Sequence, residues 1–163
     1  MNVVRPLSLL AATIAMGLVT GGFALYAHTI MPGLRKTADR TFVSAFQSLD
    51  RAIINPWFIG GCFLGALAFT VLSAITHLGR PALPWITAAL LLYLAAFVIT
   101  LSVHVPLNDA IKAAGDPARI PDLAAVRRGF NEARWAGWNL VRTLTSALAF
   151  TCLAWSLLLS GTW

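Results

Sequence analysis

Residues 85–108 read WITAALLLYLAAFVITLSVHVPLN, and this stretch decides the fold class. It contains no Asp, Glu, Lys or Arg. At about 1.5 Å of rise per residue, a helix of this length crosses a hydrocarbon core of roughly 30 Å. The stretch ends in His104, Pro106 and Asn108, and polar groups at membrane depth usually face the bundle interior or water. Two interpretations stay open for this end: part of an internal polar site, or an ordinary helix end at the membrane surface.

Three further apolar segments, at about residues 7–30, 57–76 and 140–159, accompany the span at 85–104. The chain is 58% hydrophobic and 11% charged, whereas soluble domains carry about 25% charged residues. The first segment exceeds the roughly 7–15 apolar residues of a signal peptide, so we interpret it as a retained helix. We therefore predict an all-α fold: a four-helix transmembrane bundle that forms one membrane domain over residues 1–163.

The first connector, residues 34–56, has its own apolar pattern. Phe42, Phe46, Leu49 and Ile53 recur at three- and four-residue spacing, which predicts an amphipathic interfacial helix between spans 1 and 2. Asn55 precedes Pro56, and this pair is typical of the start of a helix.

The ends of the other spans are predicted from their proline, glycine and capping residues. Met31-Pro32-Gly33 should end the first span, and residues 109–121 should form a loop. Asp122 is a favourable N-cap, so a helical extension should run from there to Trp138, with a bend at Gly137, before span 4.

Four spans in series bring the ends of the first and third, and the starts of the second and fourth, to one side of the membrane. Ten of the 12 lysines and arginines lie on that side, while Arg5 and Arg80 lie on the other. Because positive residues favour the cytoplasmic side, we expect a multi-pass protein of the plasma (inner) membrane with both termini non-cytoplasmic. The formal charge of +6 is explained by lipid headgroups, and no nucleic-acid partner is expected.

The same side collects the polar residues of the spans. They are His28, Gln47, Asn55, His104, Asn108, Asp109, Asn139 and Arg142. Asn139 and Arg142 are three residues apart and share a helix face, so they should point the same way. Arg127, Arg128 and Arg134 are interpreted as solvated or lipid-facing. Two aromatic belts are expected, one of Trp57, Trp135 and Trp138 and the other of Trp85, Trp155 and Trp163.

Small residues suggest close helix contacts. Gly17-x-x-x-Gly21 and Gly61-x-x-x-Gly65 offer faces either for packing within the bundle or for a homo-oligomer. Cys62 and Cys152 both lie in apolar segments and are interpreted as small packing residues rather than as a disulfide.

Several blocks of the sequence resemble one known family. They are His28-x-x-Met31-Pro32, Phe42-x-x-x-Phe46-Gln47, Asn55-Pro56, Val105-Pro106-Leu107-Asn108 and Arg134-Trp135-x-x-Trp138-Asn139-x-x-Arg142-Thr143. Together they resemble the signature of the anthrone-oxygenase-like integral membrane family (DUF1772). The resemblance implies a small four-helix membrane protein. Its characterised members oxidise lipophilic anthrones to anthraquinones with O₂ and have no obvious cofactor-binding fold.

Such chemistry without a cofactor needs a base for a carbon-bound proton and donors for the resulting oxyanion. His104 or His28 is the candidate base, and Asp109 is a weaker one. The candidate oxyanion donors are Arg142, Asn108 and Asn139. The remaining candidates, for binding a flat substrate, are Phe46, Gln47, Asn55, Trp135 and Trp138.

Two other functions stay open. Imidazole and carboxylate ligands suit Cu or non-haem Fe, so a metal-dependent oxidase would use His28 and His104 with Asp109. A non-enzymatic membrane protein would instead bind a lipid- or quinone-like molecule or a partner protein.

Overall fold

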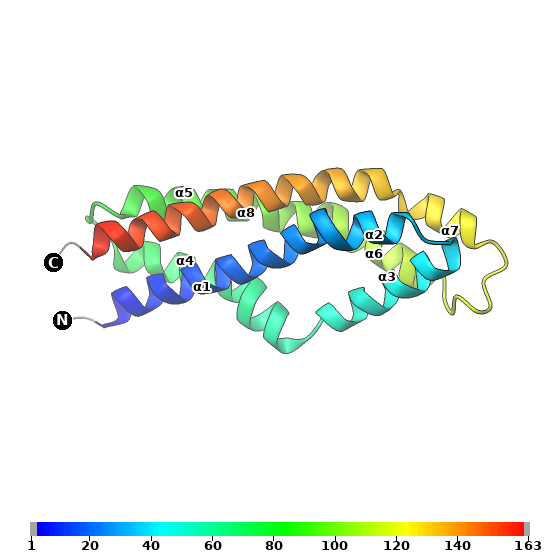
Figure 1. Cartoon of the computed structure of the whole chain (residues 1–163). Coiled ribbons are helices and arrows are strands. Elements are labelled where there is room, and N and C mark those ends of the chain that lie inside the picture. The colour runs from blue at the N-terminus through cyan, green and yellow to red at the C-terminus, as the bar shows by residue number, and fades with distance from the viewer. Residues whose placement is uncertain (1–2, 162–163) are drawn as a thin grey trace.

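Every regular element in residues 3–161, the part of the chain that the computed structural model describes, is helical (Figure 1). Span 1 consists of α1 (Val4–Leu25), the π-helical segment η1 (Tyr26–Ile30) and α2 (Met31–Arg35). Helix α3 (Asp39–Ile53) leads to span 2, formed by η2 (Pro56–Leu64) and α4 (Gly65–Thr76). Span 3 joins α5 (Leu83–Ile99), η3 (Thr100–His104) and α6 (Val105–Ala113). Short α7 (Leu123–Phe130) precedes span 4, the long α8 (Glu132–Ser160).

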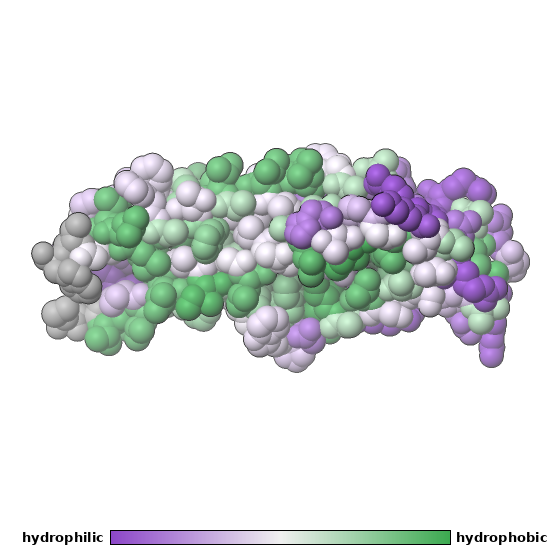
Figure 2. All heavy atoms as spheres, in the orientation of Figure 1, coloured by the Kyte–Doolittle hydropathy of each residue, from purple (hydrophilic) through white to green (hydrophobic). Residues whose placement is uncertain are grey.

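These four spans are long and apolar enough to cross a membrane, which fits a membrane protein. Helix α8 packs on α1 and α5, and α4 packs on the same two helices, which makes a four-helix bundle. Apolar side chains also cover much of the outside of the bundle, and polar side chains gather at the end that carries α2, α3 and α7 (Figure 2). The predicted fold class is confirmed, and the start of α1 and the end of α8 lie together at the opposite end.

Two buried clusters hold the two ends together. The first fills the bundle between α1, α4, α5 and α8, and includes Met16, Val19 and Tyr93. The second gathers Phe42 and Phe46 of the predicted amphipathic helix with Phe130 and Trp135. The apolar face of α3 therefore packs against the protein's own α7 and α8. Trp135 is only 1% exposed, so its assignment to an aromatic belt is wrong, whereas Trp57, Trp85, Trp138 and Trp155 are exposed. Trp163 lies outside the described residues.

Two predicted helix ends are wrong for a common reason. Pro32 was expected to end span 1 and Pro106 to end span 3, yet both helices continue beyond the proline. A proline lacks the N–H for a normal helical bond, and its ring collides with the carbonyl four residues earlier. In both helices a π-helical segment precedes the proline, and the residue just before it donates to a carbonyl five residues back: Met31 to Tyr26, and Val105 to Thr100. These wider turns let the helices continue.

The connection to span 4 also differs from the prediction. Asp122 caps α7 as expected, since its carboxylate accepts from the N–H of Ala125 at 2.8 Å. The helix then breaks at Asn131, not at Gly137, and α8 is continuous from Glu132. Asn131 has φ 54°, a left-handed conformation that Asn tolerates better than most residues, and its side chain accepts from the N–H of Arg134.

The glycine motifs behave differently from each other. A Cβ on Gly17 would lie 3.0 Å from Phe150 of α8, whereas one on Gly21 would meet nothing within 4 Å. The first motif therefore packs within the bundle through Gly17, beside Gly22, whose Cβ would lie 3.4 Å from Phe58. A Cβ on Gly61 would meet nothing within 4 Å, and the nearest atoms to Gly65 belong to its own span. For the second motif, the nearest atoms therefore give no sign of a close contact with another described helix. Cys62 and Cys152 are free thiols.

Candidate functional site

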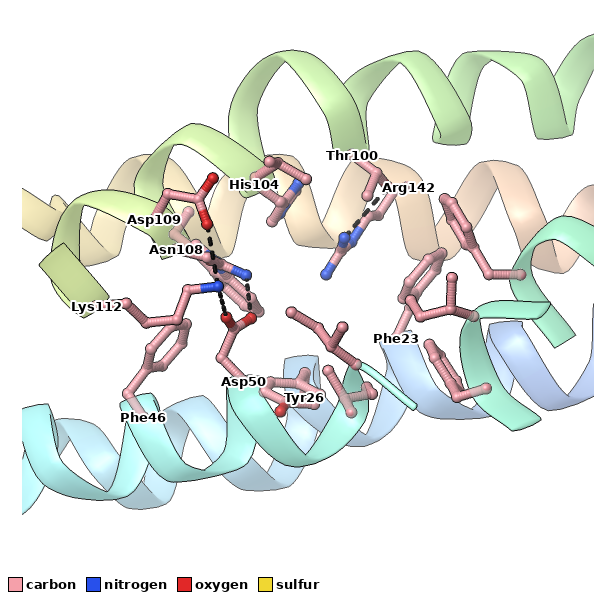
Figure 3. A pocket seen from close by; sticks show the side chains of 17 residues that line it. Phe23, Tyr26, Phe46, Asp50, Thr100, His104, Asn108, Asp109, Lys112 and Arg142 are labelled. Atoms are coloured by element: carbon pink, nitrogen blue, oxygen red, sulfur yellow. Dashed lines mark hydrogen bonds and ion pairs between the residues drawn. The ribbon is translucent and has the colours of Figure 1, made fainter. Parts of the chain in front are cut away.

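A pocket of about 150 Å³ opens where the two buried clusters meet (Figure 3). This volume is many times the roughly 10–15 Å³ that one water requires, so it leaves space for an organic ligand. Its lining residues come from all four spans and from α3. Apolar walls are supplied by Phe23, Phe46, Phe58, Phe63, Trp135 and neighbouring isoleucines; polar groups come from Tyr26, Asp50, Thr100, His104, Asn108, Asp109, Lys112 and Arg142.

The three π-helical segments all contribute to this pocket. Tyr26 belongs to η1, Phe58 and Phe63 to η2, and Thr100 and His104 to η3. A π turn inserts one extra residue and so re-aims the side chains around it, which is why such turns recur at functional sites. Pro32 and Pro106, which follow η1 and η3, therefore also shape the site.

Arg142 is a buried charge in the pocket, with 7% of the residue exposed. Its Nε donates to Oδ1 of Asn139 at 2.9 Å, and its Nη1 donates to the hydroxyl of Thr100 at 3.3 Å. The guanidinium carbon lies 4.1 Å from the ring centre of Phe23 and 5.5 Å from that of Trp135. All of these neighbours are uncharged, so the cation is held in position without being neutralised.

His104 lies between the apolar and polar parts of the pocket and is 2% exposed. Its ring meets Trp135 edge to face, with 4.9 Å between the ring centres. Nδ1 lies 3.4 Å from the carbonyl oxygen of Ile99, whereas Nε2 is buried and has no hydrogen-bond partner among the described residues. With the proton on Nδ1, facing that carbonyl, the Nε2 lone pair is free to accept a proton.

A chain of polar contacts closes the outer end of the pocket. The indole N–H of Trp135 donates to Asn108 Oδ1 at 2.9 Å, and Asn108 Nδ2 donates to Asp50 Oδ1 at 2.6 Å. Lys112 pairs with Asp50 at 2.7 Å and with Asp109 at 3.0 Å (Figure 3). These contacts tie α3, α6 and α8 together, and they fix the ring against which His104 packs.

Residues 51–152, well over half of the chain, match the family model of anthrone oxygenase. The chain belongs to the anthrone oxygenase family. No curated protein and no solved structure matches the chain. The range matched to anthrone oxygenase includes His104, Asn108, Trp135 and Arg142, and leaves out Tyr26.

The structure brings together only part of the set predicted from the sequence. His104, Asn108, Arg142, Phe46 and Trp135 line the pocket, as does Asp109. Asn139 is buried but does not line it; instead it accepts from Arg142 and donates to the carbonyl of Phe23, so it positions the guanidinium.

The remaining predicted residues lie elsewhere in this anthrone oxygenase family member. His28 is exposed, outside the pocket, and contacts Thr29 through Nδ1. Gln47 donates to the carbonyls of Ile111 and Gly115 and so fastens α3 to the end of α6. Asn55 caps η2 by accepting from the N–H of Phe58. Trp138 is 41% exposed and does not line the pocket.

The predicted metal ligands are not gathered. Among residues 3–161, no group of three or more His, Cys, Asp or Glu side chains is arranged to hold a metal ion. Of the proposed set, His104 and Asp109 share the pocket and His28 does not.

Asp50 and Lys112 line the pocket but were not among the candidates predicted from the sequence. The signal was present for Asp50: it continues the four-residue spacing of Phe42 and Phe46, and so falls on the buried face of α3. Lys112 follows Asn108 at the same spacing, but it could be placed only once α6 was known to continue past Pro106.

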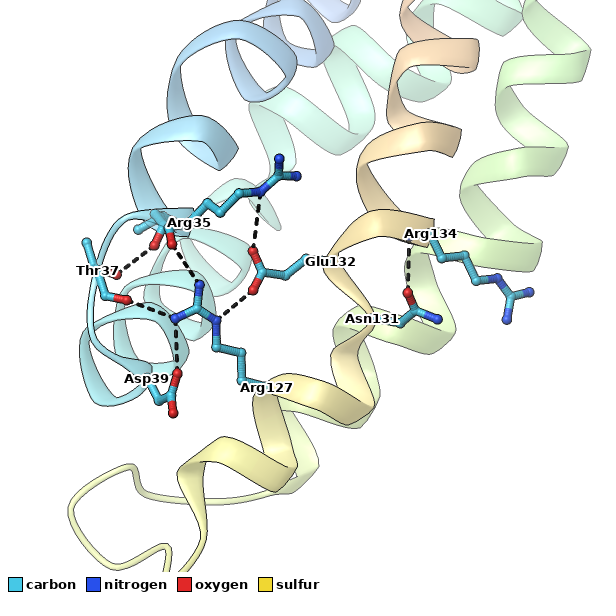
Figure 4. Close-up of polar contacts among 8 residues, drawn as sticks. Arg35, Thr37, Asp39, Arg127, Asn131, Glu132 and Arg134 are labelled. Atoms are coloured by element: carbon cyan, nitrogen blue, oxygen red, sulfur yellow. Dashed lines mark hydrogen bonds and ion pairs between the residues drawn. The ribbon is translucent and has the colours of Figure 1, made fainter.

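Arg127 was interpreted as solvated or lipid-facing, which is wrong. Its side chain is 15% exposed and stacks over Phe42, with 4.4 Å to the ring centre. It pairs with Glu132 at 2.6 Å and Asp39 at 3.0 Å, and it also donates to the carbonyls of Thr37 and Arg35 (Figure 4). Arg127 therefore joins α7 to the start of α3 and of α8.

We expect Arg127→Ala to lower the free energy of unfolding by about 1–3 kcal/mol, because Glu132 and Asp39 lose their shared donor. Arg128→Ala, at a side chain 71% exposed, should change it by less than about 0.5 kcal/mol. Unfolding of the two variants in detergent, followed by circular dichroism, compares them. Equal losses would contradict the role given to Arg127.

Proposed function

We propose that this anthrone oxygenase family member is a membrane oxygenase that oxidises a flat, phenolic, anthrone-type substrate with O₂. The observation that carries the proposal is one pocket in which aromatic walls enclose a histidine with a free nitrogen and an arginine without a counterion. Family membership supports the same reaction class.

The reaction begins with proton removal. Nε2 of His104 takes a proton from the carbon opposite the substrate carbonyl, and the charge moves to the carbonyl oxygen. Arg142 stabilises this oxyanion, helped by its fixed position on Asn139 and Thr100. Aromatic rings such as Phe58, Phe63 and Trp135 lie against the flat body of the substrate.

Reaction of the substrate anion with O₂ then completes the oxidation. The electron-rich carbon forms a C–O bond with O₂, the second C–H proton leaves, and the O–O bond breaks. One oxygen atom becomes the new carbonyl, and the other takes up the second C–H proton and the proton held by His104 and leaves as water. A CH₂ group is thereby oxidised by four electrons and one O₂ is reduced by four. The proposed steps use O₂ as the only oxidant and call on no cofactor.

The proposal is tested by O₂ uptake in membranes that contain the protein and are supplied with an anthrone. Uptake should exceed that of membranes without the protein, with one O₂ consumed for each anthraquinone formed. Metal analysis of the detergent-purified protein accompanies it, because stoichiometric Cu or Fe that is lost in His104→Ala would replace the cofactor-free reaction with a metal-dependent one. Uptake no faster than spontaneous oxidation would contradict the proposal and leave binding of a lipid- or quinone-like ligand.

The placement of the site in the cell is also a proposal. The ten-to-two distribution of basic residues supports a cytoplasmic position for the pocket end of the bundle, in a plasma (inner) membrane. A lipophilic substrate would then reach the pocket from the bilayer or from the cytoplasmic surface.

A further inference from the structure

Two arginines of this chain are largely buried, and they differ in their counterions. Arg127 has two carboxylates within 3.0 Å and two backbone carbonyls (Figure 4). Arg142 is bonded only to a side-chain amide oxygen and a hydroxyl, and no carboxylate lies within 4.0 Å of it in residues 3–161. Its Nη2 has no hydrogen-bond partner within that range.

The carboxylates that line the pocket already have a cationic partner. Asp50 and Asp109 both pair with Lys112, so neither is bound to Arg142. Asp109 is 62% exposed, so solvent screens its charge. Figure 3 shows this group at one end of the pocket and Arg142 at the other.

An unneutralised guanidinium at this depth is costly. Removing a charge from water disfavours folding unless the charge is paired and fully hydrogen-bonded. The rings of Phe23 and Trp135 offset part of this cost, since a cation over an aromatic face is attracted to the ring. The unsatisfied part of Arg142 borders the pocket, where a ligand can supply the missing negative charge.

We infer that the pocket binds a lipophilic monoanion, an apolar body carrying one carboxylate or phenolate whose oxygens pair with Arg142. The apolar body lies against the aromatic walls formed by Phe58 and Phe63. The Asp50 end of the pocket disfavours a second anionic group, so the charged end of the ligand is directed to Arg142. This inference rests on the pocket of the proposed function. It adds that the pocket also binds a ligand that is already ionised, which resembles the anion formed by proton removal, and that oxidation is not needed for binding.

Two fluorescent ligands of nearly equal shape test this inference. Anthracene-9-carboxylate carries the anion, and 9-anthracenemethanol replaces it with a neutral hydroxyl. Their dissociation constants are measured with the full chain in nanodiscs of uncharged lipid, with empty nanodiscs as the background. We expect the carboxylate to bind about tenfold or more tightly than the alcohol, because charge-assisted pairs are the stronger ones.

Two variants test whether Arg142 causes the preference for the carboxylate. Arg142→Gln should reduce it to about twofold or less, while Arg128→Gln, at an exposed side chain outside the pocket, should keep it. Equal binding of the two ligands by the unmodified chain would overturn the inference, as would a preference that survives in folded Arg142→Gln. If Arg142→Gln does not fold, the comparison of the two ligands on the unmodified chain still tests the inference.

The result separates this inference from the proposed reaction. A preference for the carboxylate without anthrone-dependent O₂ uptake would keep the monoanion site and overturn the oxygenase. Anthrone-dependent O₂ uptake without a preference for the carboxylate would keep the oxygenase and overturn the monoanion site.

Discussion

His104→Gln should lower the turnover of an anthrone-type substrate by about 10²-fold or more, the usual scale for a positioned acid or base. Glutamine keeps polar atoms at the site but cannot take the carbon-bound proton. The substrate dissociation constant should change much less, because the base acts mainly in the transition state. Single-turnover oxidation by detergent-purified protein, with binding measured separately, distinguishes the two effects.

His28→Gln is the matched control, because the sequence alone gives both histidines the same candidacy. His28 is exposed and lies outside the pocket, so its replacement should leave turnover within about twofold. Loss of turnover in His28→Gln with retention in His104→Gln would assign the base to His28, on span 1 and outside the pocket, and would refute the site. Equal retention in both would remove histidine from the reaction.

The bundle could be predicted from the sequence because a bilayer imposes few solutions. An uncharged stretch such as residues 85–104 must be helical to satisfy its own backbone, and its length fits one crossing. Four such segments then fix which helix ends share a side, and this alone brought His104 and Arg142 to the same end of the molecule. The structure adds that these two side chains line one pocket.

The details at the helix ends could not be predicted, because a proline permits two outcomes. Pro32 and Pro106 each remove one helical hydrogen bond, after which a helix either ends or widens into a π turn. The choice depends on packing around the proline. At Pro32 the continuing turn buries Met31 in the second cluster beside Phe42, and past Pro106 the helix buries Ile111 there. Contacts of this kind join residues far apart in the chain.

The charge pairs could not be predicted either, because their partners are also far apart in the chain. Asp50 meets Asn108, 58 residues away, and Arg127 meets Asp39, 88 residues away. Periodicity assigns a residue to a helix face but does not identify what that face meets. Arg127 therefore looked like any exposed arginine, although it is half-buried and paired with two carboxylates, whereas the buried Arg142 is bonded to an amide oxygen and a hydroxyl.

Trp135 and Trp138 give the second large expected effect, since the sequence presents them as equivalent stacking residues. Trp135→Ala should lower the free energy of unfolding by about 3–5 kcal/mol, the usual cost of truncating a buried tryptophan. The buried ring contacts Phe46, Phe130 and His104, so its loss opens a cavity between the pocket and the second cluster. Trp138→Ala, at an exposed ring, should cost less than about 0.5 kcal/mol.

Trp135→Phe separates packing from positioning. The phenyl ring fills most of the space, but the 2.9 Å bond from the indole N–H to Asn108 is lost, at a cost of about 1–2 kcal/mol. Because that bond connects Trp135 through Asn108 to Asp50, its loss should also loosen the ring that orients His104, lowering turnover more than substrate binding. Unfolding in detergent and single-turnover oxidation, measured on all three variants, give both readouts. If Trp138→Ala destabilises the protein as much as Trp135→Ala, the burial that distinguishes the two rings does not govern this end of the bundle.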